Sequence, residues 1–409
     1  MTATAPPVDE RHAGEEAAAW LAREWHPGVP RRQWLAAVVD AGWAVPSWPA
    51  EWHGRGWSPA TALAVEDEFR RAGAEGAGQD RINLWANTVL AFGSDDMKRR
   101  VIRPLLLDDV RMCLLYSEPG AGSDLAGLQT RADRDGDEWV VNGQKVWTSG
   151  AATADFGMLI ARTDWDVAKH RGISFFFFPM KQSGVDVRPL KQITGESHFN
   201  EVFITDGRVP DANMLGDVGQ GWRVLQTALM YERSFMGERA RGPRSGDAPS
   251  GDGAPEEMVN TTEVDLAALA RELGRRDETL IRQEVSEVVA LRTVNQWNAQ
   301  RAKAELQQGS SSPVASLGKL AMSTILHRGA AVQTDVVGAE AMLDGPAAPR
   351  ANAANFMSLN AFFTSIGGGT DQIQRNIIGE RLLGLPREPE PDRDLPFREV
   401  RKAVDQRRP

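Results

Sequence analysis

The stretch from Leu114 to Gly150 constrains the fold of this 409-residue chain more than any other part of it. Its first half contains the run YSEPGAGSD, from Tyr116 to Asp124, in which a proline and two glycines exclude a helix interior. The run therefore predicts a loop whose backbone turns tightly and can approach a ligand closely. The hydroxyls of Ser117 and Ser123 are its available hydrogen-bond donors.

The second half of this stretch predicts an antiparallel sheet. Turn signals DG at 135–136 and NG at 142–143 flank the β-rich run 138–141. A planar heteroaromatic cofactor needs an apolar surface to lie on and hydrogen-bond donors at its edge. On these residues alone, a plain turn followed by a core tryptophan is the favoured interpretation, and the cofactor site is the alternative. The residues suited to the cofactor end the second strand: Trp147, Thr148 and Ser149.

Composition excludes several classes of function. A formal net charge of -9 argues against nucleic acid as the main partner, because phosphate backbones require clustered Lys and Arg. The single cysteine, Cys113, excludes an intramolecular disulfide, and its apolar neighbours predict a buried, unreactive thiol. The six histidines show no metal-ligand spacing, so we expect no metal site. No apolar run approaches about 18 residues and the N-terminus lacks a signal peptide, so we expect a cytoplasmic protein without membrane association.

The order of helical and strand signals predicts a mainly α fold with a central antiparallel β domain. Ser58 and Ser94 are N-cap residues of helices in the first region, and four tryptophans between 43 and 57 are predicted packing anchors. The run 241–260, rich in Gly, Pro and Ser, predicts a mobile surface loop. The charged tail from Pro386 is expected to fray or to lie on a neighbouring molecule. The predicted domains are 1–113 (helical), 114–218 (β) and 219–409 (helical bundle).

The strand and helix predictions follow from periodicity and from breaker residues. Beyond the first hairpin, the predicted strands are Phe156 to Thr163, Gly172 to Phe178, Val185 to Leu190 and His198 to Thr205. The predicted helices after them begin at Gly219 and continue with Leu266 to Leu306, Pro313 to Val337 and Asn352 to Ile366.

One carboxylate lies on an apolar helix face. In the helix that begins at Gly219, Leu225, Leu229 and Met236 share a stripe with Glu232 at helical spacing. A carboxylate on such a face is costly unless it is paired or used in chemistry. An ion pair with Arg239 and a functional role are therefore both open.

A run of three glycines, 367–369, interrupts two amphipathic helices near the end of the chain, and Thr370 caps the second helix. Consecutive glycines leave their backbone N–H groups uncovered, which suits an anion or a polarised oxygen. A plain helix–helix turn is the alternative.

The string EPGAGSD followed by NGQKVWTSG, together with GGT-x-Q-I-Q-R-N-I-I near the end, resembles the acyl-CoA dehydrogenase family over roughly residues 14 to 386. The resemblance implies a helical bundle–β domain–helical bundle fold that binds FAD and an acyl-CoA thioester. It also implies a homo-oligomer (a dimer or tetramer) or a hetero-tetramer with FAD sites shared between subunits, and an electron-transfer flavoprotein or similar electron acceptor.

The resemblance also implies roles for individual residues. The loop from Leu114 to Ser123 should contact the flavin, Trp147 should lie along its ring, and Ser149 should hydrogen-bond its N5 edge. Ser123 should also reach the CoA portion, and Arg233 should lie on the substrate side. The implied cofactor-binding residues are Leu114, Tyr116, Ser117, Gly122, Ser123, Trp147, Thr148, Ser149, Gly369, Thr370 and Gln372.

The chain departs from the common family pattern at Gly368, where that pattern has the Glu that removes the α-proton. Some branches place this base on the helix after the β domain, and Glu232 stands at that position here. We therefore predict that Glu232 is the catalytic base, with its pKa raised by burial, and that the Gly368 N–H helps to polarise the thioester oxygen. Asp371 and Glu380 are rival carboxylates, explained respectively as a first-turn acid and as the partner of a nearby arginine.

Two further motifs of the family are altered. Its Arg-x-x-Phe-Gly motif is absent near residue 270, and its Gln-x-x-Gly-Gly motif is replaced by DVVGA at 335–339. These changes leave two alternatives open. One is a non-catalytic or half-site partner subunit of a heteromeric acyl-CoA dehydrogenase, and the other is an acyl-CoA oxidase or tailoring flavoenzyme on the same fold.

Overall fold

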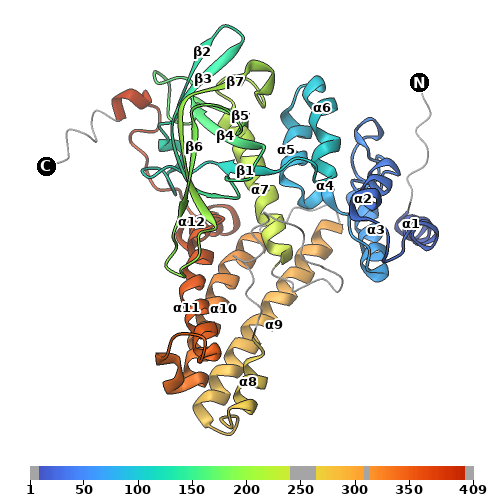
Figure 1. Cartoon of the computed structure of the whole chain (residues 1–409), viewed down its shortest axis with the longest axis vertical. Coiled ribbons are helices and arrows are strands. Elements are labelled where there is room, and N and C mark those ends of the chain that lie inside the picture. The colour runs from blue at the N-terminus through green and yellow to red at the C-terminus, as the bar shows by residue number, and fades with distance from the viewer. Residues whose placement is uncertain (1–8, 240–263, 308–313, 401–409) are drawn as a thin grey trace, which may run out of the picture.

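The computed structural model describes residues 9–239, 264–307 and 314–400, but not the side chains of residues 232–239, 303, 306–307 and 314–316. The predicted loop 241–260 therefore lies outside the described residues. A helical region comes first, a β domain follows, and a bundle of long helices completes the chain (Figure 1). This arrangement confirms the predicted mainly α fold with a central β domain.

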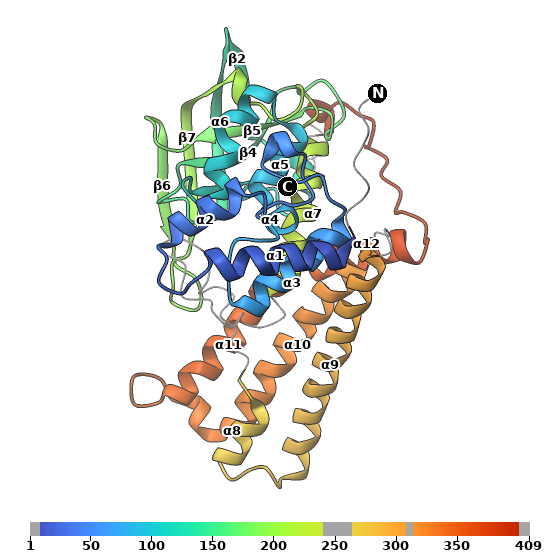
Figure 2. The ribbon, with the colours of Figure 1, turned by 90° about the vertical axis from the view of Figure 1, so that its right-hand side faces the viewer.

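Short helices cover one side of the β domain (Figure 2). The predicted N-caps are confirmed, since the Ser58 and Ser94 hydroxyls accept from the Thr61 and Met97 N–H groups. Trp43 and Trp48 are buried in the core of this region, as predicted for packing anchors. The helices are α1 (Glu10–Glu24), α2 (Arg31–Asp40), α3 (Pro59–Ala72), α4 (Gln79–Ile82), α5 (Leu84–Phe92) and α6 (Asp95–Leu106), with a 3-10 turn η1 (Ala50–Trp52).

The β domain is one curved sheet of seven strands. The order along it is β1-β4-β2-β3-β7-β6, and β5 pairs with β4. Its strands are β1 (Met112–Leu115), β2 (Arg131–Asp135), β3 (Glu138–Ser149), β4 (Phe156–Arg162), β5 (Ile173–Pro179), β6 (Val185–Leu190) and β7 (Phe199–Pro210). The strands predicted after the first hairpin match β4 to β7 to within a few residues at either end.

The sheet is mixed rather than wholly antiparallel. β1 pairs with β4 in parallel, with Leu114 opposite Met158, and β2 meets β4 in parallel at Arg131 and Arg162. The other pairings are antiparallel, as predicted. Alternating hydrophobicity reports which face of a strand is buried but not the direction of its partner, so the sequence could not distinguish the two.

The predicted turn at 142–143 is wrong. β3 runs through it from Glu138 to Ser149, and only the DG signal at 135–136 forms a hairpin turn. A Cβ on Gly143 would lie 2.4 Å from the Thr130 hydroxyl oxygen, so the glycine serves close strand packing. Asn142 exchanges two hydrogen bonds with Asp206 on β7.

β5 places two phenylalanines in each of two cores by alternation. Phe175 and Phe177 join the core shared with the N-terminal helices and the next helix, α7 (Gly221–Arg239). Phe176 and Phe178 face the opposite side of the sheet, in the core of the β domain itself. The sheet is therefore buried on both faces at this strand, which fixes α7 against it.

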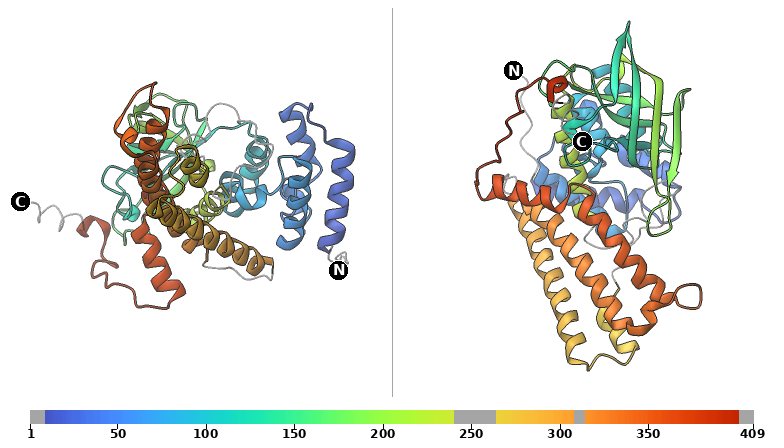
Figure 3. Two further views of the ribbon diagram at one scale, coloured as in Figure 1. Left: turned by 90° about the horizontal axis from the view of Figure 1, so that it is seen from below. Right: turned by 90° about the vertical axis from the view of Figure 1, so that its left-hand side faces the viewer.

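The C-terminal bundle is built from long helices that extend away from the β domain (Figure 3). A third apolar core joins α8, α9 and α10. Gly274, with φ of 70°, breaks the first predicted helix into two. The elements are α8 (Leu266–Glu272), α9 (Thr279–Gln307), α10 (Val314–Val337), η5 (Gly338–Met342), α11 (Pro349–Ile366), α12 (Asp371–Ile377) and η6 (Ile378–Leu382).

The sequence predicts that the tail from Pro386 frays or lies on a neighbouring molecule, but its described end docks on its own chain. It returns to the β domain of its own chain, where Phe397 is buried. The Phe397 N–H donates to the Val167 carbonyl and the Arg398 N–H to the Trp165 carbonyl.

Two further sequence-based expectations concern reactive or ligating side chains. Cys113 is buried, as predicted, and burial raises the pKa of its thiol to about 12. Among the described residues, no three His, Cys, Asp or Glu side chains are grouped closely enough to hold a metal ion. None of the described helices combines the length and the apolar character needed to cross a membrane.

Candidate active site

A buried ion pair anchors the predicted cofactor loop to strand β3. The Lys145 side chain is fully buried, and its Nζ lies 2.9 Å from the Glu118 Oε1 and 3.0 Å from the Tyr116 carbonyl oxygen. The neighbouring Val146 N–H donates to the Ser117 carbonyl at 2.9 Å. Three consecutive loop residues, 116 to 118, are thus tied to β3 just before its Trp147.

The same carboxylate also holds the far end of the loop. Glu118 accepts from the Gln129 N–H at 2.7 Å and from the Thr130 N–H at 2.8 Å. Burial on its own raises the pKa of Glu118, but Lys145 and the two amide donors outweigh it and hold the pKa below its usual range. Burial lowers the pKa of Lys145, against the opposing effect of Glu118. The pair closes the loop 118–130 on itself.

Sequence analysis assigned no role to Glu118 or Lys145, although a signal was present. In β3 the buried positions Trp139 and Val141 alternate with exposed or half-buried ones. Lys145 lies in the same odd-numbered series and is therefore on the inward face. A lysine on an inward face requires a buried anion, and Glu118 in the loop was the available candidate.

Trp147 is turned outward by a local irregularity of β3. Between Lys145 and Thr148 the strand has one residue more than β7, which is a β-bulge. Trp147 has φ of 62°, the left-handed region that bulky residues seldom adopt, and its side chain is 61% exposed. The Asn200 amide donates to the Thr148 carbonyl at 2.9 Å and fixes the strand beyond the bulge. Strain of this kind concentrates at functional sites.

Aromatic contacts connect Trp147 to the C-terminal glycine turn. The Trp147 ring meets the edge of Phe199 with centroids 5.8 Å apart, and Phe199 lies 5.7 Å from Phe363 on α11. A Cβ on Gly367 would lie 3.0 Å from the Phe363 ring. The structure therefore brings together the end of β3 and the start of the turn 367–369, which the sequence separates by more than two hundred residues.

The glycine turn leaves an unused backbone donor. Gly368 and Gly369 have φ of 64° and 91°. The Gly368 carbonyl accepts from the Gln374 amide at 3.3 Å, whereas no described residue accepts from the Gly368 N–H. Thr370 caps α12 as predicted, accepting from the Ile373 N–H at 3.2 Å. A donor of this kind suits the predicted contact with a polarised oxygen.

The remaining predicted residues differ in accessibility. Ser123 and Gln372 are exposed, and a Cβ on Gly122 would meet no atom within 4 Å. The Tyr116 ring packs in the core at 5.9 Å from Phe175. A cofactor contact by Tyr116 would therefore have to come from its backbone. Leu114, Ser117 and Ser149 are half-buried.

The side chains of Glu232 and Arg233 lie outside the described residues, as does that of Arg239, the alternative partner of Glu232. Their backbone belongs to α7, whose predicted apolar stripe is confirmed at Leu225, which is buried, and at half-buried Leu229. α7 packs closely on β5, because a Cβ on Gly221 would lie 2.5 Å from the Ser174 carbonyl carbon.

The rival carboxylates are both paired. Asp371 accepts from the Ser323 hydroxyl at 2.8 Å and lies 3.3 Å from the Lys319 ammonium, while Glu380 lies 3.2 Å from the Arg387 guanidinium. Neither is a free carboxylate in the described structure, which agrees with the structural roles predicted for them.

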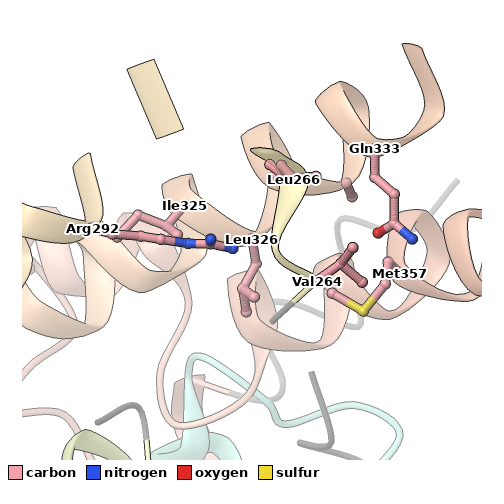
Figure 4. Close-up of a pocket in the computed structure, with 9 residues that line it drawn as sticks. Val264, Leu266, Arg292, Ile325, Leu326, Gln333 and Met357 are labelled. Carbon is pink, nitrogen blue, oxygen red and sulfur yellow. The ribbon is translucent and has the colours of Figure 1, made fainter. Parts of the chain in front are cut away.

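Two hollows lie in the bundle. The one shown in Figure 4, among α8 to α11, has a volume of about 10 Å³, which is too small for a substrate. The other, of about 430 Å³, opens to solvent beside Asp371. It is lined by Ser323, Thr324, His327, Arg328, Ala331 and Asp371.

Comparison with known protein families assigns all three parts of the chain. Residues 9–108 match the N-terminal domain of acyl-CoA dehydrogenases, residues 113–206 the middle domain, and residues 263–383 the C-terminal domain.

Individual relatives agree. The acyl-CoA dehydrogenase IpdE1 of Mycobacterium tuberculosis is 36% identical over 383 residues, which cover 90% of this chain and 91% of the relative. Among solved structures, the Tcur3481-Tcur3483 steroid ACAD has a TM-score of 0.69 at 26% identity, covering 94% of this chain and 99% of that chain. The ChsE4-ChsE5 complex from Mycobacterium tuberculosis has a TM-score of 0.65 at 29% identity, covering 95% and 100%.

Proposed function

The chain belongs to the acyl-CoA dehydrogenase family, a family of oxidoreductases, and on this premise we propose that it carries out FAD-dependent α,β-dehydrogenation of an acyl-CoA thioester. Glu232 removes the α-proton in this proposal. The observation that carries it is the arrangement of Trp147: a strained, exposed ring, held by a bulge and connected through Phe199 and Phe363 to the glycine turn.

The described residues fit a flavin at this position. Trp147 offers a flat apolar surface, and the glycines of the loop 120–122 leave open space beside their backbone. The Thr148 hydroxyl is buried without a hydrogen-bond partner among the described residues. Trp147, Thr148 and Ser149 from β3, the loop 114–123, and Gly369, Thr370 and Gln372 from the bundle would hold the cofactor. When bound, FAD would supply the acceptor for the β-hydride.

The chain's own residues prepare the thioester for proton removal. The α C–H is a weak acid until the carbonyl oxygen is polarised, and the Gly368 N–H is a donor that no described residue uses. Glu232 then accepts the proton as general base. Because the donor at 368 is a backbone group, replacing the common glutamate by glycine moves the base without removing the donor. Ser123 and Arg233 are the proposed contacts on the CoA and acyl side.

An oligomer is part of the proposal. α11 exposes the large apolar side chains Phe362 and Ile366, four residues apart and on one face, beside the cofactor turn. The steroid ACAD and the ChsE4-ChsE5 structure are titled with two different components each. A half-site subunit of such a heteromer is therefore the second candidate function, supported also by Gly368.

The test uses the purified protein. We expect it to bind FAD near one per chain and, under anaerobic conditions, to lose the oxidised flavin absorbance with at least one member of an acyl-CoA panel. The panel includes a steroid-derived acyl-CoA, because one relative is titled a steroid ACAD. Bleaching only after a second subunit is added would support the half-site candidate. Hydrogen peroxide formed in air without another electron acceptor would indicate an oxidase. The proposed reaction would be contradicted if the protein held one FAD per chain and no acyl-CoA of the panel reduced the flavin.

Trp147→Ala tests the cofactor surface. We expect FAD to bind about 10-fold more weakly, because a stacked ring contributes about 1.5 kcal/mol beyond its buried area. Stability of the cofactor-free protein should change little, since the side chain is 61% exposed. Fluorescence titration with FAD and thermal unfolding measure the two effects.

Trp297→Ala is the matched control, since Trp297 is 62% exposed and lies on α9. Trp297→Ala should change neither the FAD affinity nor the stability of the cofactor-free protein. Equal FAD affinities for the two variants would remove Trp147 from the cofactor site.

A further inference from the structure

We infer that the C-terminal segment 396–398 is a strap that positions the cofactor loop, acting through the buried guanidinium of Arg162. Phe397 and Arg162 are positioning residues in this inference, not catalytic ones. The inference rests on the proposed function for its link to FAD, but the contacts that carry it belong to this chain alone.

The strap returns to the β domain from the end of the bundle that lies next to it. The red segment after α12 runs back to the β domain in Figures 1 and 3. There Pro396 forms a β-bridge with Ala168, and Arg398 pairs with Asp166 at 2.9 Å. Phe397 is buried, at 3% exposure, beside Trp165. The segment is therefore a docked element with backbone, ionic and apolar contacts.

The group beneath the strap is a fully buried cation. Arg162, at the end of β4, is 0% exposed and donates to three backbone carbonyls: Ala126 at 2.7 Å, Leu128 at 3.1 Å and Lys169 at 3.0 Å. It forms no salt bridge with a described carboxylate. Burial lowers the pKa of Arg162 to about 10, against the attraction of more distant acids led by Glu118.

The strap supplies part of the stabilisation that a buried guanidinium without a salt bridge needs. The Phe397 ring lies over the guanidinium, with 3.6 Å from its central carbon to the ring centroid. The negative face of an aromatic ring attracts a cation, and most strongly where water is excluded. The ring also closes the site against water, which would otherwise compete for the guanidinium N–H groups.

Two of the three carbonyls that Arg162 holds, those of Ala126 and Leu128, lie in the loop 118–130, which continues the cofactor loop. Ala126 and Leu128 lie between Ser123, the proposed CoA contact, and Gln129 and Thr130, whose N–H groups bind Glu118. The loop is thus fixed from one side by Lys145 and Glu118 and from the other by Arg162. Only the second support depends on a segment from the end of the chain.

Phe397→Leu tests this coupling, because leucine keeps an apolar plug but has no ring face. We expect faster amide hydrogen exchange at residues 125–130 in the FAD-free protein and FAD binding weakened about 10-fold. Phe397→Trp, which restores a ring face, should return FAD affinity toward the wild-type value. Arg398→Ala, which loses only the exposed Asp166 pair, should change both readouts in the same direction and by less.

Val288→Ala is the control for a general loss of stability, since Val288 is fully buried in the bundle core away from this loop. The inference would be overturned if Phe397→Leu and Val288→Ala showed the same amide exchange at 125–130 and the same FAD affinity. A Phe397→Trp variant as weak as Phe397→Leu would also overturn it. Should Phe397→Leu not fold, unchanged exchange in Arg398→Ala would overturn it. A wild-type protein that binds no FAD would contradict the proposed function, while the exchange measurement would still test the strap.

Discussion

Glu232→Gln is expected to slow anaerobic reduction of the bound flavin by an acyl-CoA by about 10²- to 10⁴-fold, the usual contribution of a general base. The amide has the shape of the carboxylate but cannot accept the α-proton. FAD content and acyl-CoA affinity should stay near the wild-type values, because the contacts proposed for both come from other residues. Stopped-flow absorbance at saturating acyl-CoA measures the rate directly, and a titration of the oxidised flavin spectrum measures binding.

The rival carboxylate supplies the matched control. Glu380→Gln removes a carboxylate paired with Arg387 and should leave the reduction rate unchanged. Equal rates for wild type and Glu232→Gln would exclude Glu232 as the base. A large loss in Asp371→Asn alone would assign the proton to the acid beside the glycine turn, despite its hydrogen bond from Ser323.

The position proposed for the base agrees with the backbone conformation of the glycine turn as well as with the sequence. Gly368 has φ of 64°, a region in which a side chain is strained by roughly 1 kcal/mol or more. With glycine the turn adopts this conformation freely, and a carboxylate must then come from another element. α7 is the proposed element, since its helical period carries Glu232 on the same stripe as buried Leu225.

Local signals in the sequence were sufficient for most elements. The caps Ser58, Ser94 and Thr370 and the short β-rich runs of β4 to β7 depend on residues close together in the chain. The structure has these caps and strands, although β7 extends to Pro210, beyond the predicted end at Thr205. The Asn-Gly pair at 142–143 is a strong local turn signal, so the prediction of a turn there was wrong for a non-local reason. The close approach of Gly143 to Thr130 favours a continuous strand instead. The direction of strand pairing and the docking of the tail likewise depend on contacts between distant parts of the chain. No local sequence pattern could therefore predict them.

For the candidate site, too, local features could be predicted from the sequence, but contacts between distant residues could not. The loop, the tryptophan strand and the glycine turn were predicted as separate pieces from local residues, and the family resemblance assigned all three to one cofactor site. What joins them, namely the Phe199–Phe363 contact and the ion pair of Lys145 with Glu118, is visible only in three dimensions. Sequence periodicity marked Lys145 as inward-facing, but its partner lies 27 residues earlier in an irregular loop.

Lys145→Met is expected to lower the free energy of unfolding by about 3–5 kcal/mol, because it leaves the buried Glu118 carboxylate without its counter-ion. Methionine fills the space of the lysine stem, so the loss reflects charge rather than a cavity. The loop 116–118 also loses both bonds from the Lys145 ammonium and keeps only the Val146 backbone bond to β3, so FAD affinity should fall together with stability. Urea unfolding followed by tryptophan fluorescence, with FAD titration in parallel, measures both effects.

Two controls separate the buried pair from ion pairs in general. Glu15→Gln removes the exposed partner of Arg11 and should cost at most about 0.5 kcal/mol. Combining Glu118→Gln with Lys145→Met removes both charges, so the double variant should lose less than the sum of the single losses. Strict additivity would show that the two charges do not stabilise each other.

The acid side of the stability profile gives an independent check on the pair. The pKa of Glu118 is lowered in the folded state, so its contribution is complete above the pKa of an unfolded glutamate, about 4.3, and is lost as pH falls through the folded value. Wild-type stability should therefore fall with acid over that range, and Glu118→Gln should lack this part of the fall. Identical acid profiles for the two proteins would mean that Glu118 is not held as a carboxylate by Lys145 and the two loop amides.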